Sequence, residues 1–270
     1  MPRISLVIPA FNEEHYLPRL LQSVDSARQR YQAGANEVEV IVADNASTDS
    51  TASLARARGC RVVEVEKRAI AAARNGGARV ATGQVLAFID ADSEIHPDTF
   101  NAIDRTLASG RVVVGATTVR YNRLSPGIAL TTIVALTFFR LTGLDAGVVF
   151  CRRSDWQAVG GYEEDRRWLE DAWFLTALKR LGRTRGQHFA RAKGARAITS
   201  TRKYDQLGDW HLFTHLLPRG LARLAFDRPG FARLVESYWY EDRLNPGSGR
   251  SPVPRRNLEL QATDLKVKGE

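Results

Sequence analysis

The first ninety residues alternate between short apolar runs and longer segments in which apolar residues recur every three or four positions. The short runs predict four strands, at residues 4–8, 37–42, 61–65 and 85–90. The segments between them predict helices, at residues 13–30, 50–58 and 69–81. Strands that alternate with helices in this way predict an α/β fold with a Rossmann-like, mostly parallel sheet flanked by helices on both faces.

The alternation loosens beyond residue 97, where the pattern predicts a smaller mixed region. Strand-like segments lie at residues 111–120 and 147–151, and helix-like segments at 97–109, 154–159, 170–181 and 204–225. From residue 245 the chain is rich in Pro, Gly and charged residues, which is typical of a flexible tail. We therefore expect one domain with two halves, residues 1–115 and 116–244, followed by a tail at 245–270.

The composition is that of a folded protein that attracts anions. Apolar residues make up 44% of the chain, and 39 Lys and Arg against 30 Asp and Glu give a formal charge of +9. Nucleotide phosphates, nucleic acid and acidic membrane faces all fit this charge, but no basic stretch alternates with aromatic residues as in single-strand binders, so we expect no nucleic acid partner. Cys60 and Cys151 lie far apart without a CxxC motif, which fits a reducing cytoplasm.

Two segments bear on location in the cell. The first predicted strand begins within about three residues of Met1, so we expect no signal peptide. The longest apolar run covers residues 126–139, only 14 residues, whereas a membrane span needs roughly 20. We expect a core or interfacial helix there, and a cytoplasmic protein that either stays in solution or contacts the inner face of the membrane peripherally.

Polar side chains follow each of the four predicted strands. The segments that carry them are Pro9-Ala10-Phe11-Asn12-Glu13, then Asp44, then Lys67-Arg68, then Asp90-Ala91-Asp92. Turns are commonly polar for purely structural reasons, but parallel strands deliver all four groups to one edge of the sheet, where α/β proteins bind ligands. Two carboxylates separated by one small residue suit a hard divalent cation.

Together these groups suit a nucleoside diphosphate. A carboxylate such as Asp44 or Glu13 can accept hydrogen bonds from a pyrimidine ring N–H or from ribose hydroxyls. Arg74, one turn into the third predicted helix, can offset phosphate charge. Asp92, with or without Asp90, can hold Mg²⁺ or Mn²⁺ bridging two phosphates.

The motifs resemble those of the inverting family 2 glycosyltransferases of the GT-A fold. In order, the matching elements are Val7 to Glu14, Asp44 to Asp49, Ala73-Arg74-Asn75-Gly76-Gly77, Asp90-Ala91-Asp92, and Gly160-Gly161-Tyr162 followed by Glu170-Asp171. The resemblance covers about residues 4–181. The second element departs from the commoner Asp-Asp-Gly-Ser form, because Ala43 replaces the first aspartate and Asn45-Ala46 follows Asp44, which leaves the base of the donor open.

The resemblance implies a role for each matching residue. A nucleotide-sugar site would comprise Pro9, Ala10, Phe11, Asn12, Glu13, Asp44, Arg74, Asn75, Asp90, Ala91 and Asp92 in the first half of the chain. Asp92 would be the more direct metal ligand and Asp90 the group nearer the ribose. The donor would be a UDP- or GDP-sugar. Residues 116–244 would bind a hydroxyl acceptor, which the mix of apolar and cationic residues there suggests is lipid-linked.

Asp171 is the expected catalytic base, by this resemblance and by its position. Attack on an anomeric carbon needs an acceptor hydroxyl that loses its proton, and a carboxylate within hydrogen-bond reach can take it. A helix N-terminus keeps a carboxylate ionised, although Glu170 and Asp171 are also both simply favourable at a helix start.

Several alternatives stay open. Residues 199–204, Thr-Ser-Thr-Arg-Lys-Tyr, form either a lid over the diphosphate or a solvated basic turn. His188 or His211 would complete a metal site, and Tyr238-Trp239-Tyr240 would stack on a sugar or pack a helix. As rival functions we consider a retaining GT-A transferase, a nucleotidyltransferase, and a sugar-nucleotide-binding protein without catalysis.

Overall fold

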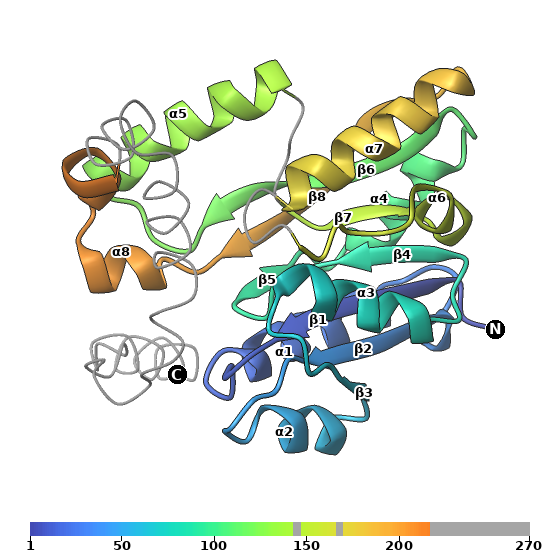
Figure 1. Ribbon diagram of the computed structural model, residues 1–270, viewed down its shortest axis with the longest axis horizontal. Coiled ribbons are helices and arrows are strands. Elements are labelled where there is room, and N and C mark those ends of the chain that lie inside the picture. The colour runs from blue at the N-terminus through green and yellow to red at the C-terminus, as the bar shows by residue number, and fades with distance from the viewer. Residues whose placement is uncertain (143–146, 166–169, 217–270) are drawn as a thin grey trace, which may run out of the picture.

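The computed structural model describes residues 1–142, 147–165 and 170–216, and within them an eight-stranded sheet of order β3-β2-β1-β4-β7-β6-β8-β5 (Figure 1). The first four strands are β1 (Ile4–Ala10), β2 (Val38–Asp44), β3 (Arg61–Glu64) and β4 (Val85–Phe88). β1 pairs in parallel with both β2 and β4, and β2 pairs in parallel with β3. The predicted α/β fold with a mostly parallel sheet is confirmed.

The other four strands are β5 (Ser93–Ile95), β6 (Val112–Tyr121), β7 (Val149–Arg152) and β8 (His188–Thr199). β7 is antiparallel to both β4 and β6, so β4 and β6 point the same way. β8 is parallel to β6, while the short β5 is antiparallel to β8. The carboxyl ends of β1, β2, β3, β4, β6 and β8 therefore all lie at one edge of the sheet.

Helices cover both faces of the sheet. They are α1 (Leu17–Gln29), α2 (Thr51–Ala57), α3 (Ile70–Val80), α4 (Thr99–Leu107), α5 (Pro126–Thr142), α6 (Arg153–Val159), α7 (Glu170–Thr184) and α8 (Arg202–Leu207). A 3₁₀ turn, Ala35–Glu37, precedes β2, and a π-helical turn, Leu212–Leu216, follows α8. α5 and α8 lie near each other at the left of Figure 1, beyond the ends of β6 and β8.

The core consists of two layers separated by the sheet. Side chains alternate along a strand, so Ile4, Leu6 and Ile8 pack against α1 and α4, and Val7 packs with α3 on the other face. Burial on both faces explains why β1 is apolar except at Ser5, whose buried hydroxyl accepts the Gly83 N–H. α3 lies so close to the sheet that a Cβ on Gly77 would come within 2.4 Å of Val7 Cγ1.

Some predicted boundaries were wrong, each for a local reason. The helix expected at residues 13–30 starts at Leu17, because the Glu13 carbonyl accepts the Tyr16 N–H in a turn and Pro18 favours the first helical turn. The strand expected at 85–90 ends at Phe88, so Asp90 lies beyond it. Of the helix expected at 204–225, the described part holds α8 and the π-helical turn. Residues 217–244, Tyr238 to Tyr240, and the tail at 245–270 lie outside the described residues.

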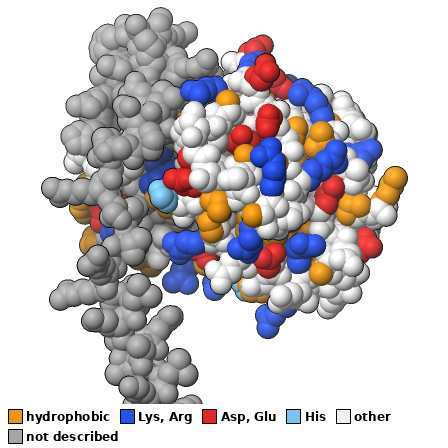
Figure 2. All heavy atoms as spheres, turned by 90° about the horizontal axis from the view of Figure 1, so that it is seen from below, with side chains coloured by type: hydrophobic (Ala, Val, Ile, Leu, Met, Phe, Trp, Pro, Cys, Tyr) orange, Lys and Arg blue, Asp and Glu red, His pale blue; other side chains and the backbone are white. Residues whose placement is uncertain are grey.

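Two further observations concern the surface. No helix in the described ranges combines the length and apolarity that crossing a membrane requires, α5 included. On the face shown in Figure 2, basic side chains are scattered among acidic and apolar ones.

Candidate functional site

The loops after β1, β2, β4, β6 and β8 meet at the carboxyl edge of the sheet. The Asp90-Ala91-Asp92 turn follows β4, and the Asp90 carbonyl accepts the Ser93 N–H at 3.1 Å. Ala91 is buried, which fixes the turn and leaves its two neighbours at the surface. The Asp90 side chain is 53% exposed and that of Asp92 is 17% exposed, so the two carboxylates have different surroundings.

Arg74 connects this turn to the start of α7. Its guanidinium donates from Nη2 to Asp90 Oδ1 at 2.9 Å and from Nη1 to Asp171 Oδ1 at 2.7 Å and Glu170 Oε1 at 3.1 Å. It also lies 5.2 Å from the centroid of the Tyr162 ring. Burial opposes the charge on Arg74, but the carboxylates of Asp171, Asp90 and Glu170 outweigh it, so the pKa of Arg74 is raised well above its usual value.

Asp171 is the second residue of α7, and its surroundings favour proton uptake. Desolvation is the largest influence and raises the pKa of the carboxyl, Arg74 lowers it, and the nearby Glu170 and Asp90 carboxylates raise it again, to about 7. The side chain is 38% exposed and so accessible from solvent. A carboxylate that is half ionised near neutral pH is suited to general base chemistry.

Arg202, the first residue of α8, links two other acidic residues of the site. It donates from Nη1 to Glu13 Oε2 at 3.1 Å, and its Nη2 lies 3.2 Å from Asp92 Oδ2. Its guanidinium also stacks over the Tyr16 ring, 4.9 Å from the centroid. Burial opposes the charge of Arg202, but Glu13 and Asp92 outweigh it and raise the pKa. The sequence allowed segment 199–204 to be either a lid or a solvated basic turn. In the structure this segment places the Arg202 guanidinium beside Asp92.

The loop after β1 is locked to the loop after β2. Asn12 has a left-handed backbone (φ 53°), and its Oδ1 accepts the Thr48 N–H at 2.8 Å. Asp44 ends β2 and is buried. Its Oδ1 accepts the Ser47 N–H at 3.4 Å. The Arg68 guanidinium lies 4.9 Å from the centroid of the Phe11 ring. Pro9 and Ala10 complete β1, beside Ala43 and Asp44 of β2.

Asn75 uses its amide inside the protein. Its Nδ2 donates to the Tyr162 carbonyl at 2.8 Å and to Glu164 Oε1 at 2.9 Å, and its Oδ1 accepts the Tyr162 N–H at 2.9 Å. These bonds tie α3 to the Gly160-Gly161-Tyr162 turn. Asn75 is therefore placed to hold that turn.

His188 and His211, the two histidines considered as metal ligands, have different positions in the fold. His188 begins β8 opposite Val112, whereas Thr199, at the other end of the strand, pairs with Ser93 next to Asp92. A strand of this length spans on the order of 30 Å, so His188 is not a ligand of a metal held by Asp92. His211 is buried near α8, where its Nδ1 lies 2.8 Å from the Gly208 carbonyl and its ring packs edge-on against Tyr204.

The donor set for a cation consists of carboxylates. Within the described ranges, no group of three or more His, Cys, Asp or Glu side chains is arranged to hold a metal ion. Asp90 and Asp92, separated by Ala91, nevertheless provide carboxylate oxygens, which suit Mg²⁺ or Mn²⁺ when a bound diphosphate supplies further oxygens. A polar pocket borders Asp92 on the side of α1, lined by Tyr16, Arg19, Asp92, Ser93, Glu94, Asn122, Ile198 and Ser200.

Comparison of the sequence with known proteins points to one family. The sequence model of glycosyl transferase family 2 matches residues 5–185. Glycosyltransferase AglE of Haloferax volcanii is 34% identical over 102 residues, 36% of this chain and 32% of AglE. Validoxylamine A glucosyltransferase of Streptomyces hygroscopicus subsp. limoneus is 38% identical over 96 residues, 33% of this chain and 20% of that protein. The matches thus span about a third or less of these curated relatives.

Solved structures share the fold at low sequence identity. Mannosyltransferase PcManGT from Pyrobaculum calidifontis, in complex with GDP-Man and Mn²⁺, has a TM-score of 0.59 at 19% identity, covering 98% of this chain and 79% of that one. S. aureus TarS 1-349 in complex with UDP-GlcNAc has a TM-score of 0.59 at 16% identity, covering 87% and 80%. Both structures therefore share the fold of this chain over most of its length.

Proposed function

This chain belongs to glycosyl transferase family 2, and we propose on that premise that it moves a sugar from a nucleoside diphosphate sugar to a hydroxyl acceptor. The main support for this proposal is that the Arg74 side chain contacts two parts of the site at once. Arg74 bonds Asp90 of the turn after β4 and Asp171 at the start of α7. The turn that would bind phosphate and the carboxylate that would take a proton therefore lie side by side, as transfer between two bound substrates requires.

The first half of the chain, residues 1–115, would bind the donor. Asp44 faces the base, and Pro9, Phe11 and Glu13 line the nucleoside pocket between the loops after β1 and β2. A UDP- or GDP-sugar is the best-supported donor, because solved relatives of the same fold hold UDP-GlcNAc and GDP-Man. Asn75 acts in this site indirectly, by holding the turn at Tyr162.

The diphosphate would lie between the carboxylates and the arginines. Asp92, with Asp90 beside it, would hold Mg²⁺ or Mn²⁺, which when bound neutralises charge on the leaving diphosphate. PcManGT was solved with Mn²⁺, which supports a divalent ion here. Arg202 supplies a second, protein-borne cation to the same phosphates from the start of α8, and residues 199–204 act as the lid.

Asp171 would act as the general base. The acceptor oxygen forms a bond to the anomeric carbon as the bond to the diphosphate breaks, and the bonding electrons leave with the diphosphate. The hydroxyl proton passes to Asp171, whose pKa of about 7 lets it accept that proton near neutral pH. Attack from the face opposite the leaving group inverts the anomeric centre, and NMR assignment of the product anomer tests this step against a retaining mechanism.

An apolar acceptor fits the second half of the chain. Six exposed large apolar side chains lie on or just before α5 and on or just after α8: Leu124, Leu130, Ile133, Val134, Leu207 and Trp210. Such a surface suits a lipid-linked hydroxyl acceptor presented at the inner face of a membrane. The purified protein should bind anionic liposomes at low salt, and failure to do so contradicts this part of the proposal.

A thermal-shift panel tests the donor. UDP, GDP, dTDP and CDP are each added with and without Mn²⁺, and the true nucleotide raises the melting temperature by mass action. The expected result is one nucleotide that stabilises the protein strongly and only with the metal. If no nucleotide shifts the melting temperature under either condition, the proposed function is wrong.

A further inference from the structure

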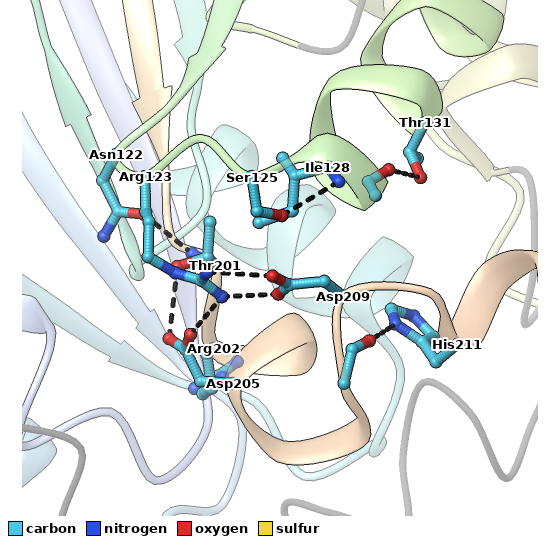
Figure 3. Close-up of polar contacts among 12 residues, drawn as sticks. Asn122, Arg123, Ser125, Ile128, Thr131, Thr201, Arg202, Asp205, Asp209 and His211 are labelled. Atoms are coloured by element: carbon cyan, nitrogen blue, oxygen red, sulfur yellow. Dashed lines mark hydrogen bonds and ion pairs between the residues drawn. The ribbon is translucent and has the colours of Figure 1, made fainter.

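Arg123 lies outside the expected site and holds the segment that carries Arg202. It sits in the loop between β6 and α5. Its Nη2 donates to Asp209 Oδ1 at 2.7 Å and to Asp205 Oδ1 at 2.7 Å, and its Nη1 donates to Asp209 Oδ2 at 3.1 Å (Figure 3). Arg123 thus binds one carboxylate with both ends of its fork and also bonds a second.

The same loop makes further contacts with this segment. Asn122 Oδ1 accepts the Thr201 N–H at 3.1 Å, and the Asn122 N–H donates to the Thr199 carbonyl at 3.2 Å. The Tyr121 and Tyr204 rings pack edge-to-face with centroids 5.4 Å apart. Residues 121–123 therefore form a platform along one side of residues 199–209, and Arg123 secures the end farther along the chain.

The first turn of α5 closes the arrangement. A Cβ on Gly127 would lie 2.5 Å from the Asp209 carbonyl oxygen, so the helix backbone packs directly on Asp209. The Ser125 hydroxyl accepts the Ile128 N–H in the same turn. Asp209 is thereby held from two sides, by the α5 backbone and by the Arg123 guanidinium.

α8 depends on these contacts for its position. It has six residues, none of them fully buried, so apart from the contacts of the Tyr204 ring with Tyr121 and His211 little apolar packing fixes it. Its first residue is Arg202, which lies on Glu13 and Asp92. Asp205, within the helix, and Asp209, just beyond it, are the residues that Arg123 binds.

We propose that Arg123 is a positioning residue for the donor diphosphate, acting through Arg202. By fixing Asp205 and Asp209 it sets where α8 begins, and so keeps the Arg202 guanidinium at the carboxylates that face the donor. This inference rests on the proposed function, because it assumes that Arg202 meets phosphate there. A single exposed ion pair contributes little, but a bidentate pair that belongs to a network contributes more.

The test compares Arg123→Gln with Arg105→Gln. Arg105 lies on α4, apart in the chain from residues 121–123 and 199–209, and also pairs with a partly exposed aspartate, Asp98. For Arg123→Gln we expect donor nucleotide affinity to fall about tenfold in the presence of Mn²⁺, with no such loss for Arg105→Gln. Arg123→Lys should recover only part of the loss, because an ammonium cannot reproduce the fork.

A double variant shows whether Arg123 acts through Arg202. If it does, Arg123→Gln added to Arg202→Gln weakens nucleotide binding no further than Arg202→Gln alone. Full additivity of the two losses overturns the proposal, as does equal nucleotide affinity of wild type and Arg123→Gln.

Amide hydrogen exchange separates this inference from the proposed function, because it needs no nucleotide. Residues 199–211 should exchange faster in Arg123→Gln than in wild type and in Arg105→Gln. A wild-type protein that binds no nucleotide overturns the proposed function, and with it the role of Arg123 toward phosphate. Unchanged exchange in residues 199–211 overturns the positioning role alone.

Discussion

Arg74 donates a 2.7 Å hydrogen bond to the carboxylate of Asp171, the side chain that we propose as the general base. A cation lowers the proton affinity of a base, yet the pKa of Asp171 is raised, because desolvation and the carboxylates of Glu170 and Asp90 outweigh Arg74. Arg74 therefore brings that pKa down toward the range in which a base is effective near neutral pH.

Replacing Asp171 with Asn should remove turnover and leave donor binding intact. A positioned general base contributes about 10²–10⁴-fold to the rate, so kcat should fall by that factor. Glu170→Gln is the matched control, since Glu170 also bonds Arg74 but is not the proposed base, and its effect should be much smaller. Initial rates and the nucleotide thermal shift measure the two properties separately, and unchanged turnover in Asp171→Asn contradicts the assignment.

The activity should depend on pH through the same group. Below its pKa of about 7, Asp171 is protonated and cannot accept the hydroxyl proton, so kcat/KM should rise with pH and level off above neutrality. Rates measured in overlapping buffers from about pH 5.5 to 8.5 give the midpoint. A profile that is flat over this range does not agree with Asp171 as the base.

Arg74→Gln should move this profile to higher pH. Arg74 lowers the pKa of Asp171, so its removal raises that pKa, and the midpoint of kcat/KM should shift toward alkaline pH. Arg74→Lys keeps the charge and should shift the midpoint less. Because Arg74→Gln also leaves neighbouring carboxylates without their cation, thermal unfolding must confirm that each variant is folded before its profile is interpreted. A shift toward acid pH contradicts this account.

The sequence predicted the parallel half of the sheet because β1, β2 and β4 are buried on both faces and read as separate apolar runs, and because the edge strand β3 keeps Val62 and Val63 partly buried. β5 was not predicted, since a three-residue strand gives no periodicity to detect. The contact of Arg202 with Glu13 joins residues 189 positions apart, so only the folded chain reveals it. Asn75 illustrates the same limit: its motif predicted a nucleotide ligand, and its hydrogen bonds to Tyr162 became visible only in three dimensions.

Asn75→Ala should destabilise the fold. The change removes three hydrogen bonds and leaves the Tyr162 N–H without its acceptor in a buried setting. We expect a loss of about 2–4 kcal/mol in the free energy of unfolding. Asn36→Ala, at an exposed position, is the control and should change stability by less than about 0.5 kcal/mol. Denaturant unfolding without ligand measures both, and equal stability of the two variants contradicts the role of Asn75.

Asp92→Asn should uncouple nucleotide binding from the metal. An amide keeps the shape of the side chain but loses the charge that a divalent cation requires, so Mn²⁺ should no longer increase the thermal shift produced by the nucleotide. Asp90→Asn should retain part of the metal effect, because we assign Asp92 as the more direct ligand. Removing the metal from wild type with EDTA should reproduce the Asp92→Asn result. A metal-dependent shift that survives in Asp92→Asn but is lost in Asp90→Asn reverses the two assignments, and one that survives in both places the cation elsewhere.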